Sequence, residues 1–499
     1  MSDHLIEREE WAERVLAISP PGGSDLLDHL AALRGRPGQR WTRTTREMLA
    51  ARPELLEFAH GMVAVFVEML EQGEKPYRDE HGQVVMAPWR EQLDMSGNDA
   101  VLRAAIWALG VAGPPWAAEL LARAGVCGRF VTNEPGNLLN IATSAVRALG
   151  EIGAAEQLAR LQSRITHRTV LKAIGPALDD ACARRGLTLD EVRESAVDDV
   201  GLEADGRRAF EIGEARAVLQ VHPTRVELTW VQAGRERRTV PVGLRTAHKL
   251  EVDDVRRVVK EVRALLATER DRLDSLLLKG LSRSLDQWVP SYAEHPLVGV
   301  LARSLVWFVD GRAALPAAAP GRFTTLEGDF EPRPTATVEL LHPLRLPDDE
   351  LRAWQRVVTG EQTVAQLFRE TFRPDAEEAD STRSFRFARK TVDYDRAHAL
   401  LQSRGWTLPF QGPWDRDGSF EAVREFGPVR AAWFIEDRAA EPEGGMMQLA
   451  LTGAVTFSHA GVPVAMTDVD PVVLSEILRD LSLVTAGSPG PIPAPRPPL

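Results

Sequence analysis

Cysteine is nearly absent from this chain, which contains only Cys127 and Cys182 among its 499 residues. Two cysteines cannot form the disulfide framework of a small secreted protein or a cysteine-rich zinc site. Long apolar runs are absent too, because the most apolar stretches, such as 62–67 and 104–112, are far shorter than the roughly 20 residues that span a bilayer. The first residues carry charges of both signs and do not resemble a secretory signal. We therefore expect a soluble, cytoplasmic protein that does not bind membranes.

Motifs of the common enzyme classes are also missing. The sequence has no GxxxxGKS or GxxxxGKT phosphate loop, no GxGxxG turn, no HExxH or CxxC pair and no GxSxG serine elbow. Its eleven histidines are scattered, and no two share a helical face at a spacing of three or four residues, so a zinc site is not predicted. We expect no cofactor and no metal, and no catalytic residue is identified. Because catalytic groups can come from distant parts of a chain, enzymatic activity stays an open question, with a non-enzymatic protein favoured.

Negative charge outweighs positive charge, and the formal net charge is -12. An acidic chain repels the phosphates of nucleic acids, so nucleic acid is not an expected partner of the chain as a whole. Only six of the 60 basic residues are lysine. Genome composition explains this bias, or else an arginine-rich site binds phosphate or carboxylate groups, to which the guanidinium group donates two hydrogen bonds. The ordinary apolar fraction of 44% excludes a wholly disordered chain.

The first 200 residues are predicted to be helical and to contain an internal repeat. The sequence AIWALG at 105–110, followed by Gly113, aligns with AVRALG at 145–150, followed by Gly153, and a shorter echo lies at 171–175. An offset of 40 residues is typical of HEAT-type helix pairs, each of which buries only the face that packs on its neighbours. The small residues would allow close packing, and the glycines would end each first helix. An alanine-rich helical bundle is the alternative.

Short β-rich runs replace the helical period after residue 200. Runs at 217–221, 226–231 and 239–242 predict a small antiparallel meander. Apolar residues spaced three or four apart over 255–277 then predict a long amphipathic helix.

The rest of the chain is expected to form a second α+β region after a connector at 313–320, which is rich in alanine and proline. Strands are predicted at 335–341, 431–435 and 447–457, and a helix at 471–483. The proline-rich end cannot build a core. The expected fold class is therefore a multidomain α+β protein: helical HEAT-like repeats at 1–200, the meander with its long helix at 201–320, an α+β domain at 321–487 and a flexible tail at 488–499.

Nine polar residues of the C-terminal α+β region are candidates for ligand binding. His342 precedes a proline, which keeps it extended, and it either contacts a ligand or bonds to backbone. A helix expected near 366–373 would place Gln366 and Glu370 on one face. With Arg369 that helix would present an arginine–carboxylate site or, as is favoured, an ordinary surface or interdomain ion pair. The candidates are His342, Gln366, Arg369, Glu370, Arg386, Lys390, Ser475, Glu476 and Arg479.

Two groups among these candidates allow opposite interpretations. If the basic patch 383–390 is helical, its basic residues would meet a phosphate or an anionic nucleic-acid strand. If it is a β-strand, Phe385 and Phe387 would point inward. A structural or partner-facing role is favoured. Ser475 lacks a nearby base, so a buried polar network that joins its helix to the domain is favoured over a nucleophile.

Asp470 is favoured as a helix cap over a cation ligand. Trp406 and Trp414 would anchor a core or stack on a planar ligand.

Three groups of motifs also occur in a fixed order along the second half of the chain. The first group is ERDRLD at 269–274 with EHPL at 294–297 and LVW at 305–307. The second is VELLHPL at 338–344 with AWQ at 353–355 and QLFRE at 366–370, and the third is LSEILRDLSLV at 474–484. In this order they resemble the bacterial domain of unknown function 4132 family, found in proteins similar to the molybdate metabolism regulator MolR. The likeness extends over residues 201–487. Relatives occur beside MoxR-type AAA+ ATPases and von Willebrand A-type proteins, so the resemblance implies a role in such an assembly.

These observations together predict a protein-interaction or scaffold protein with a regulatory role in a bacterial cytoplasmic system. The resemblance implies protein partners, namely a MoxR-type AAA+ ATPase and a von Willebrand A-type protein. The alternative is an enzyme or small-ligand sensor whose site lies in the C-terminal α+β domain.

Overall fold

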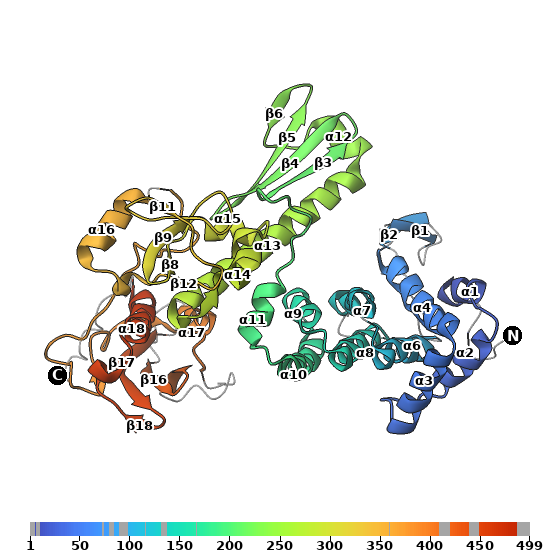
Figure 1. Ribbon diagram of the computed structural model, residues 1–499, viewed down its shortest axis with the longest axis horizontal. Helices are drawn as coiled ribbons and strands as arrows, with labels where there is room; N and C mark the ends of the chain where they lie inside the picture. Colours follow the sequence, from blue (N-terminus) through green and yellow to red (C-terminus); the bar gives the residue numbers. More distant parts are fainter. Residues whose placement is uncertain are drawn as a thin grey trace, which may run out of the picture. The chain divides into compact units, whose positions relative to one another are not determined.

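The chain divides into two compact units, Met1–Asp198 (unit 1) and Asp199–Leu499 (unit 2) (Figure 1). The predicted tail at 488–499 and the aromatic loop with Trp414 lie outside the residues that the structure describes. The computed structural model describes residues 5, 10–71, 74–78, 84–88, 98–114, 116–130, 137–165, 167–358, 360–408, 420–438 and 449–486.

Unit 1 is helical, with one additional β-hairpin, and its later helices stack in two rows. In one row α6 packs on α8 and α8 on α10, and in the other α7 packs on α9 and α9 on α11. Each helix turns an apolar face to a common core. The elements are α1 (Glu10–Ala17), α2 (Gly23–Ala31), α3 (Gln39–Ala51), α4 (Pro53–Glu71), β1 (Glu74–Arg78), β2 (Val84–Pro88), α6 (Asp99–Ala112), α7 (Ala117–Gly125), a 3-10 turn (Val126–Phe130), α8 (Asn137–Ile152), α9 (Ala155–Arg164), α10 (Arg168–Arg185) and α11 (Leu189–Ser195).

The glycines of the repeated sequence lie at helix contacts. A Cβ atom on Gly110 of α6 would come within 2.8 Å of the Cβ of Ala148 on α8, and one on Gly150 of α8 within 3.1 Å of the Cβ of Ala177 on α10. The prediction that glycines of the repeat end each first helix is confirmed at Gly113 and Gly153, but not at Gly110 and Gly150, which lie inside α6 and α8. Small residues at the contacts allow the helix backbones to approach closely. The helix ends are marked by other glycines of the repeat: Gly113 and Gly153 have φ angles of 64° and 79°, which favour glycine.

Unit 2 begins with a four-stranded antiparallel meander in the order β3-β4-β5-β6. Alternate residues of β4 are buried, and α13 packs on β3 and β5. The prediction of a strand at 239–242 is wrong, because α12 begins at Val242 and the last strand lies earlier. The elements are β3 (Arg207–Ile212), β4 (Ala215–Val221), β5 (Val226–Gln232), β6 (Arg235–Arg237), α12 (Val242–Ala247) and α13 (Lys249–Lys279).

A six-stranded antiparallel sheet follows, in the order β11-β10-β9-β8-β12-β7. The connector predicted at 313–320 is in part a strand, because Ala313 and Ala314 of β9 are buried in the sheet and pair with β8. The small side chains of Ala313 and Ala314 fit the buried layer in which this strand lies. The elements are β7 (Ser282–Ser284), α14 (Leu285–Trp288), a π-helical turn (Val289–Ala293), α15 (Val298–Ala302), β8 (Trp307–Val309), β9 (Arg312–Pro316), β10 (Phe323–Thr324), β11 (Asp329–Phe330), β12 (Thr337–Leu340), a 3-10 turn (Pro343–Arg345) and α16 (Asp348–Val357).

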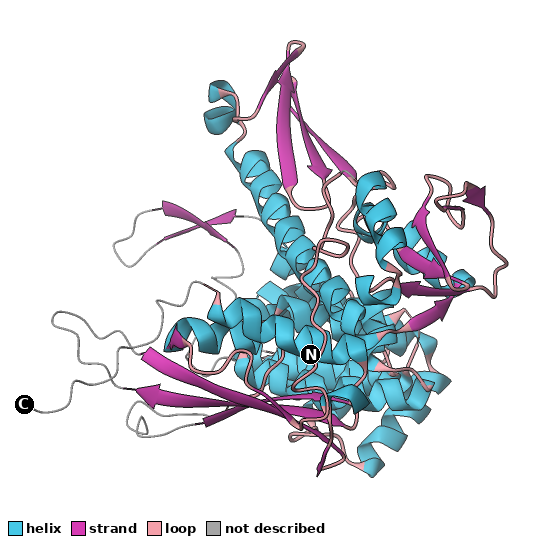
Figure 2. Cartoon of the chain, turned by 90° about the vertical axis from the view of Figure 1, so that its left-hand side faces the viewer, coloured by secondary structure: helices cyan, strands magenta, loops and turns pink. Residues whose placement is uncertain are grey.

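The last sheet is built around β17, which pairs with β13, β14, β16 and β18, while β15 pairs with β16. Helix α18 packs its apolar residues into the same cluster as Trp433 and Phe457 of this sheet. Figure 2 shows the strands gathered in separate groups and not in one continuous sheet. The elements are β13 (Arg383–Ser384), β14 (Thr391–Asp393), α17 (Tyr394–Ser403), β15 (Phe420–Phe426), β16 (Val429–Arg438), β17 (Leu449–His459), β18 (Val462–Pro463), a 3-10 turn (Met466–Asp468) and α18 (Pro471–Thr485).

This mixture of helices and antiparallel sheets supports the predicted α+β class. The finer division of unit 2 at residue 320 stays a prediction. Within the described part of the chain, no helix combines the length and the apolar character needed to cross a membrane.

Replacing Gly110 by alanine should destabilise unit 1 by about 1–3 kcal/mol, because the added Cβ overlaps Ala148. The matched control is Gly175→Ala inside α10, where the added Cβ meets nothing within 4 Å apart from its chain neighbours. There the higher helix propensity of alanine is opposed by crowding of the added Cβ against the ring of the following Pro176, so the free energy of unfolding should change by less than about 0.5 kcal/mol. Urea unfolding of both variants measures the two effects, and an equal loss at the two positions would contradict this account of the helix contacts.

Candidate functional site

Helix α18 carries three polar side chains into the interior of unit 2. It begins at Pro471, and the side chain of Asp470 accepts hydrogen bonds from the backbone N–H groups of Val472 and Val473 at 2.9 and 3.0 Å, which confirms the predicted helix cap. The apolar residues of the helix fix which face is buried. That same face includes Ser475, Glu476 and Asp480, none of which is more than 1% exposed. Buried carboxylates require partners, so the surroundings of this helix define the candidate site.

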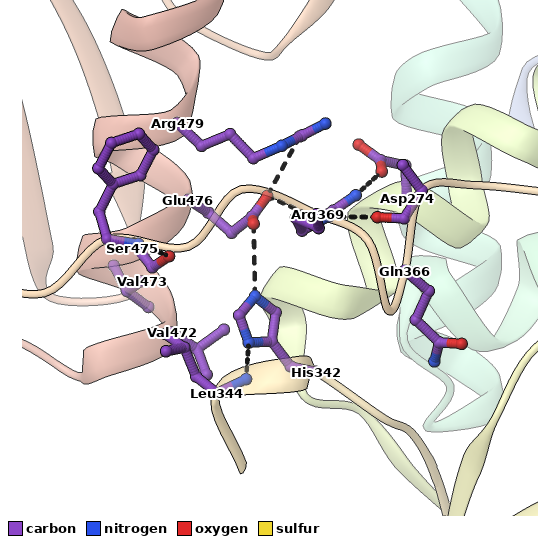
Figure 3. A network of polar contacts seen from close by, with 12 residues as sticks. Asp274, His342, Leu344, Gln366, Arg369, Val472, Val473, Ser475, Glu476 and Arg479 are labelled. Atoms are coloured by element: carbon purple, nitrogen blue, oxygen red, sulfur yellow. Dashed lines mark hydrogen bonds and ion pairs between the residues drawn. The ribbon is translucent and has the colours of Figure 1, made fainter. Parts of the chain in front are cut away.

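Glu476 is the centre of a network of polar contacts (Figure 3). Nε2 of His342 lies 3.3 Å from its Oε1 atom, and Nη1 of Arg369 donates to its Oε2 atom at 2.7 Å. Two more guanidinium groups, from Arg404 and Arg479, lie 3.7 Å from the same Oε2 atom. Burial by itself would raise the pKa of Glu476, but the hydrogen bond from His342 and the charges of Arg369 and Arg479 lower it to about 2. Glu476 is therefore ionised at neutral pH.

His342 uses both of its ring nitrogens inside the protein. Its Nδ1 atom accepts a hydrogen bond from the backbone N–H of Leu344 at 3.3 Å, so the ring proton lies on Nε2 and points to Glu476. The side chain is 1% exposed. The arrangement combines the bond to backbone predicted for His342 with a second bond to a carboxylate.

Asp274 on α13 and Asp480 on α18 extend the network on either side. Arg369 and Arg404 both pair with Asp274, the second through Nη1 at 3.1 Å. Asp480 accepts hydrogen bonds from Arg404 and Arg424 and from Nε1 of Trp406, the last at 2.9 Å. Trp406 thus acts as a core anchor, as favoured from the sequence.

The network holds more positive than negative charge. Arg369, Arg404, Arg424 and Arg479 face three carboxylates, and burial lowers the pKa of Arg479, to which the charges of Arg369 and Arg404 contribute. Burial also lowers the pKa of Arg424. For Arg404 the effect of burial is exceeded by that of Asp480 and Asp274, which raise its pKa.

Three of the predicted candidates lie close to the network without forming part of its ion pairs. Gln366 is fully buried, where its side chain accepts from the backbone N–H of Val306 and donates to the carbonyls of Val306 and Leu341. Ser475 accepts a hydrogen bond from the backbone N–H of Phe372 at 2.9 Å. Glu370 is exposed and accepts a hydrogen bond from Ser482 at 2.9 Å.

The helix expected near 366–373 does not form, so Gln366 and Glu370 do not share a helical face. The segment follows an irregular path in which Gln366 bonds to the backbone of Val306 just before β8 and of Leu341 just after β12, and the backbone N–H of Phe372 donates to Ser475 on α18.

Arg386 and Lys390 lie apart from the network and are exposed. The segment 383–390 is neither the predicted helix nor a full strand, because only Arg383–Ser384 pair with β17. Phe385 is 59% exposed, which contradicts the inward orientation expected for a strand. Arg386 instead stacks over Phe372, with its guanidinium carbon 4.9 Å from the ring centre, and lies 3.6 Å from Asp375. Most candidates therefore lie in or beside the buried network, Glu370 lies exposed next to it, and Arg386 and Lys390 form a separate exposed group.

The sequence interpretation did not single out Asp274, Arg404 and Arg424. It placed Asp480 on the helix of the favoured polar network but named no partner for it. One signal was present, because Glu476 and Asp480 lie four residues apart on an otherwise apolar helix face and such carboxylates need cationic partners. No local pattern identifies which arginines supply them.

A cavity of about 440 Å³ lies beside the network and is lined by His342. It is bounded by the end of α13, by β12 with the turn that follows, and by the first turn of α18. Its wall is mainly apolar and its polar groups are of both signs. The lining includes Leu277, Lys279, Leu340, Arg345, Asp470 and Val472.

Other reactive groups do not gather in the described residues. No three His, Cys, Asp or Glu side chains lie close enough there to hold a metal ion. Cys127 and Cys182 are buried in unit 1, and burial raises the pKa of both thiols, which disfavours a nucleophilic thiolate.

Comparison with protein families identifies one match. Residues 234–406 match the family described as Domain of unknown function (DUF4132), which supports the resemblance over less than half of the chain. The matched range contains His342, Asp274, Arg369 and Arg404, whereas α18 and Arg424 lie beyond it. No curated protein and no solved structure matches the chain.

Replacing Glu476 by glutamine should destabilise unit 2 by about 3 kcal/mol at pH 7, because the buried Arg369 loses one of its two carboxylate partners and keeps only Asp274. Urea unfolding measures the loss. The control Glu327→Gln removes an exposed carboxylate and should change the free energy of unfolding by less than about 0.5 kcal/mol.

The difference in the free energy of unfolding between wild type and Glu476→Gln should also decrease at acidic pH. The pKa of Glu476 is lowered from 4.5 to about 2, so its stabilising effect is complete above about pH 4.5 and is lost as the pH falls towards 2. The free-energy difference between wild type and Glu476→Gln should therefore shrink below pH 4.5. A difference that is the same at pH 7 and pH 3 would contradict the ion-pair assignment.

Proposed function

We propose that this chain is a protein-interaction or scaffold protein with a regulatory role in a bacterial cytoplasmic system. Its partners would be a MoxR-type AAA+ ATPase and a von Willebrand A-type protein. The resemblance to MolR-like proteins contributes one thing to this proposal, namely the kinds of protein that occur beside such relatives. The observation that carries the proposal is the recurrence of one helix contact along unit 1.

This contact joins Gly110 to Ala148 and then, 40 residues later in the first helix, Gly150 to Ala177. The glycine side of this contact repeats after 40 residues and the alanine side after 29, and the recurrence of a small-residue contact between successive helices of one row supports a stack of helix pairs. We infer that α6 to α11 form HEAT-like repeats. Such stacks offer long surfaces made of successive helices, which suit protein binding more than catalysis.

The contacts of the candidate residues support the same proposal. Gln366, Ser475 and His342 direct their polar atoms to other groups of unit 2. Glu476 is surrounded by arginines and is an ion-pair partner with a low pKa, unlike a general base, which works best with a pKa near the working pH.

A shallow hollow between α7 and α9 gives the proposal a testable surface. It is lined by Glu119 and Gln157, among others, and Glu119 is exposed. Glu119→Lys should weaken a complex with the AAA+ ATPase about tenfold or more, through charge reversal at the interface. The matched control is Glu57→Lys, an exposed position of α4 that does not line the hollow.

Size-exclusion chromatography with light scattering, with and without ATP, tests whether purified chain and ATPase form a complex, and titration gives the affinity of each variant. Failure of the wild-type chain to bind either the ATPase or the von Willebrand A-type protein in any nucleotide state would refute the proposed partners. Equal weakening by both variants would place the interface elsewhere.

An enzyme or small-ligand sensor is the second candidate, and the cavity of about 440 Å³ beside His342 favours it. Ligand sites are typically concave and mainly apolar, with a few polar groups, and the volume lies in their usual range. A ligand there would contact the first turn of α18 and, through His342, the ion network.

The dye 1-anilinonaphthalene-8-sulfonate should bind in this cavity, because it combines an apolar body with an anionic group that suits Lys279 and Arg345 on the lining. Val472→Trp should fill the cavity and reduce the fluorescence of bound dye several-fold. Val462→Trp on the exposed hairpin of β18 is the control and should leave the fluorescence unchanged. Equal dye binding by all three proteins would remove the observation that favours this candidate.

A further inference from the structure

The ion network around α18 is not electrically balanced. Four guanidinium groups face the carboxylates of Asp274, Glu476 and Asp480, which leaves one positive charge. His342 does not alter this count, because its ring carries one proton, on Nε2. Networks that serve stability alone are expected to be neutral, since an uncompensated buried charge costs several kcal/mol.

Arg479 is the member that lacks a full partner. Its Nη1 atom is buried and has no hydrogen-bond acceptor among the described residues. The closest carboxylate oxygen is Oε2 of Glu476 at 3.7 Å, beyond hydrogen-bonding distance, and that oxygen is already bound by Arg369 at 2.7 Å. Glu476 therefore satisfies Arg369 and leaves Arg479 with a charge attraction but no bond.

Arg479 also lies next to a second guanidinium group at the edge of the network. Arg404 approaches the same Oε2 atom to 3.7 Å. The side chains of Arg479 and Arg404 are 14% and 18% exposed, whereas that of Arg369 is fully buried. A small solute can therefore contact the exposed parts of Arg479 and Arg404, although not the buried Nη1 atom of Arg479, and it cannot reach Arg369.

We propose that a small oxyanion, carrying a phosphate or carboxylate group, binds between Arg479 and Arg404. The guanidinium fork matches both groups and donates two hydrogen bonds to them. One anion bound at the exposed atoms of these two side chains would neutralise the excess charge. The site differs from the cavity beside His342, which Arg479 and Arg404 do not line, and it does not depend on the proposed function.

Binding should appear as stabilisation of the full chain by the anion. In sodium phosphate the unfolding midpoint should rise by about 3 °C or more and then saturate, relative to sodium chloride at equal ionic strength and pH. Sodium acetate in the same series distinguishes a carboxylate site from a phosphate site. Isothermal titration calorimetry of phosphate into the wild-type chain provides an independent measurement that needs no variant.

Two variants separate this effect from general salt effects. Arg479→Met should abolish the saturable rise, because it removes the fork. Arg352→Met changes an exposed arginine of α16 in the same way and should keep the rise.

A rise that is linear and equal in all three proteins is the general effect of excluded salts, and it would overturn the proposal. The proposal also fails if calorimetry detects no saturable binding of phosphate or acetate. It fails as well if Arg479→Met is more stable than the wild type in chloride while the unfolding midpoint of the wild type responds to neither anion. In that last case Arg479 is simply an unpaired charge.

Discussion

The burial of two carboxylates on one face of α18 is the constraint on which the organisation of unit 2 depends. Glu476 and Asp480 are removed from water by the same packing that buries the apolar residues between them. Each must then be paired, because the free-energy cost of an isolated buried carboxylate exceeds the gain from burying the apolar residues around it. The pairing recruits Arg369 from an irregular segment, Arg404 after α17 and Arg424 from β15. Helix α18 is therefore fixed to its surroundings by directional contacts in addition to apolar packing.

These contacts cross the boundary of the family match. Asp274, His342 and Arg369 lie within residues 234–406, and α18 lies beyond them. The ion pairs between the two parts are almost completely shielded from water, where charge interactions are strong and broken pairs are costly. A fragment that ends at residue 406 would leave Arg369 and His342 without Glu476, and Arg404 without Asp480. The folding unit that contains the matched residues thus includes β15 and α18.

Regular periodicity explains which elements could be predicted from the sequence. The long helix α13, the helix α18 and the strands β16 and β17 have repeating apolar patterns, and the structure confirms them. The short strands β9 and β13 and the irregular segment around Gln366 have no such pattern, because distant backbone partners determine their conformation. The candidate site divides in the same way. Spacing within one helix identified Ser475, Glu476 and Arg479, but Arg404 and Arg424 come from positions 76 and 56 residues away from Asp480.

The same network also limits what unit 2 can do. A general acid or base has to change its protonation state near neutral pH, and a carboxylate surrounded by arginines does not. Replacement of such a network by apolar residues is often neutral for stability, so stability alone does not account for its arginine excess. What the network does provide is a fixed position for α18, whose first turn borders a cavity and whose later turn carries Arg479. Any ligand or partner that contacts either end of α18 therefore meets a rigid surface, and its binding energy is not spent on ordering that helix.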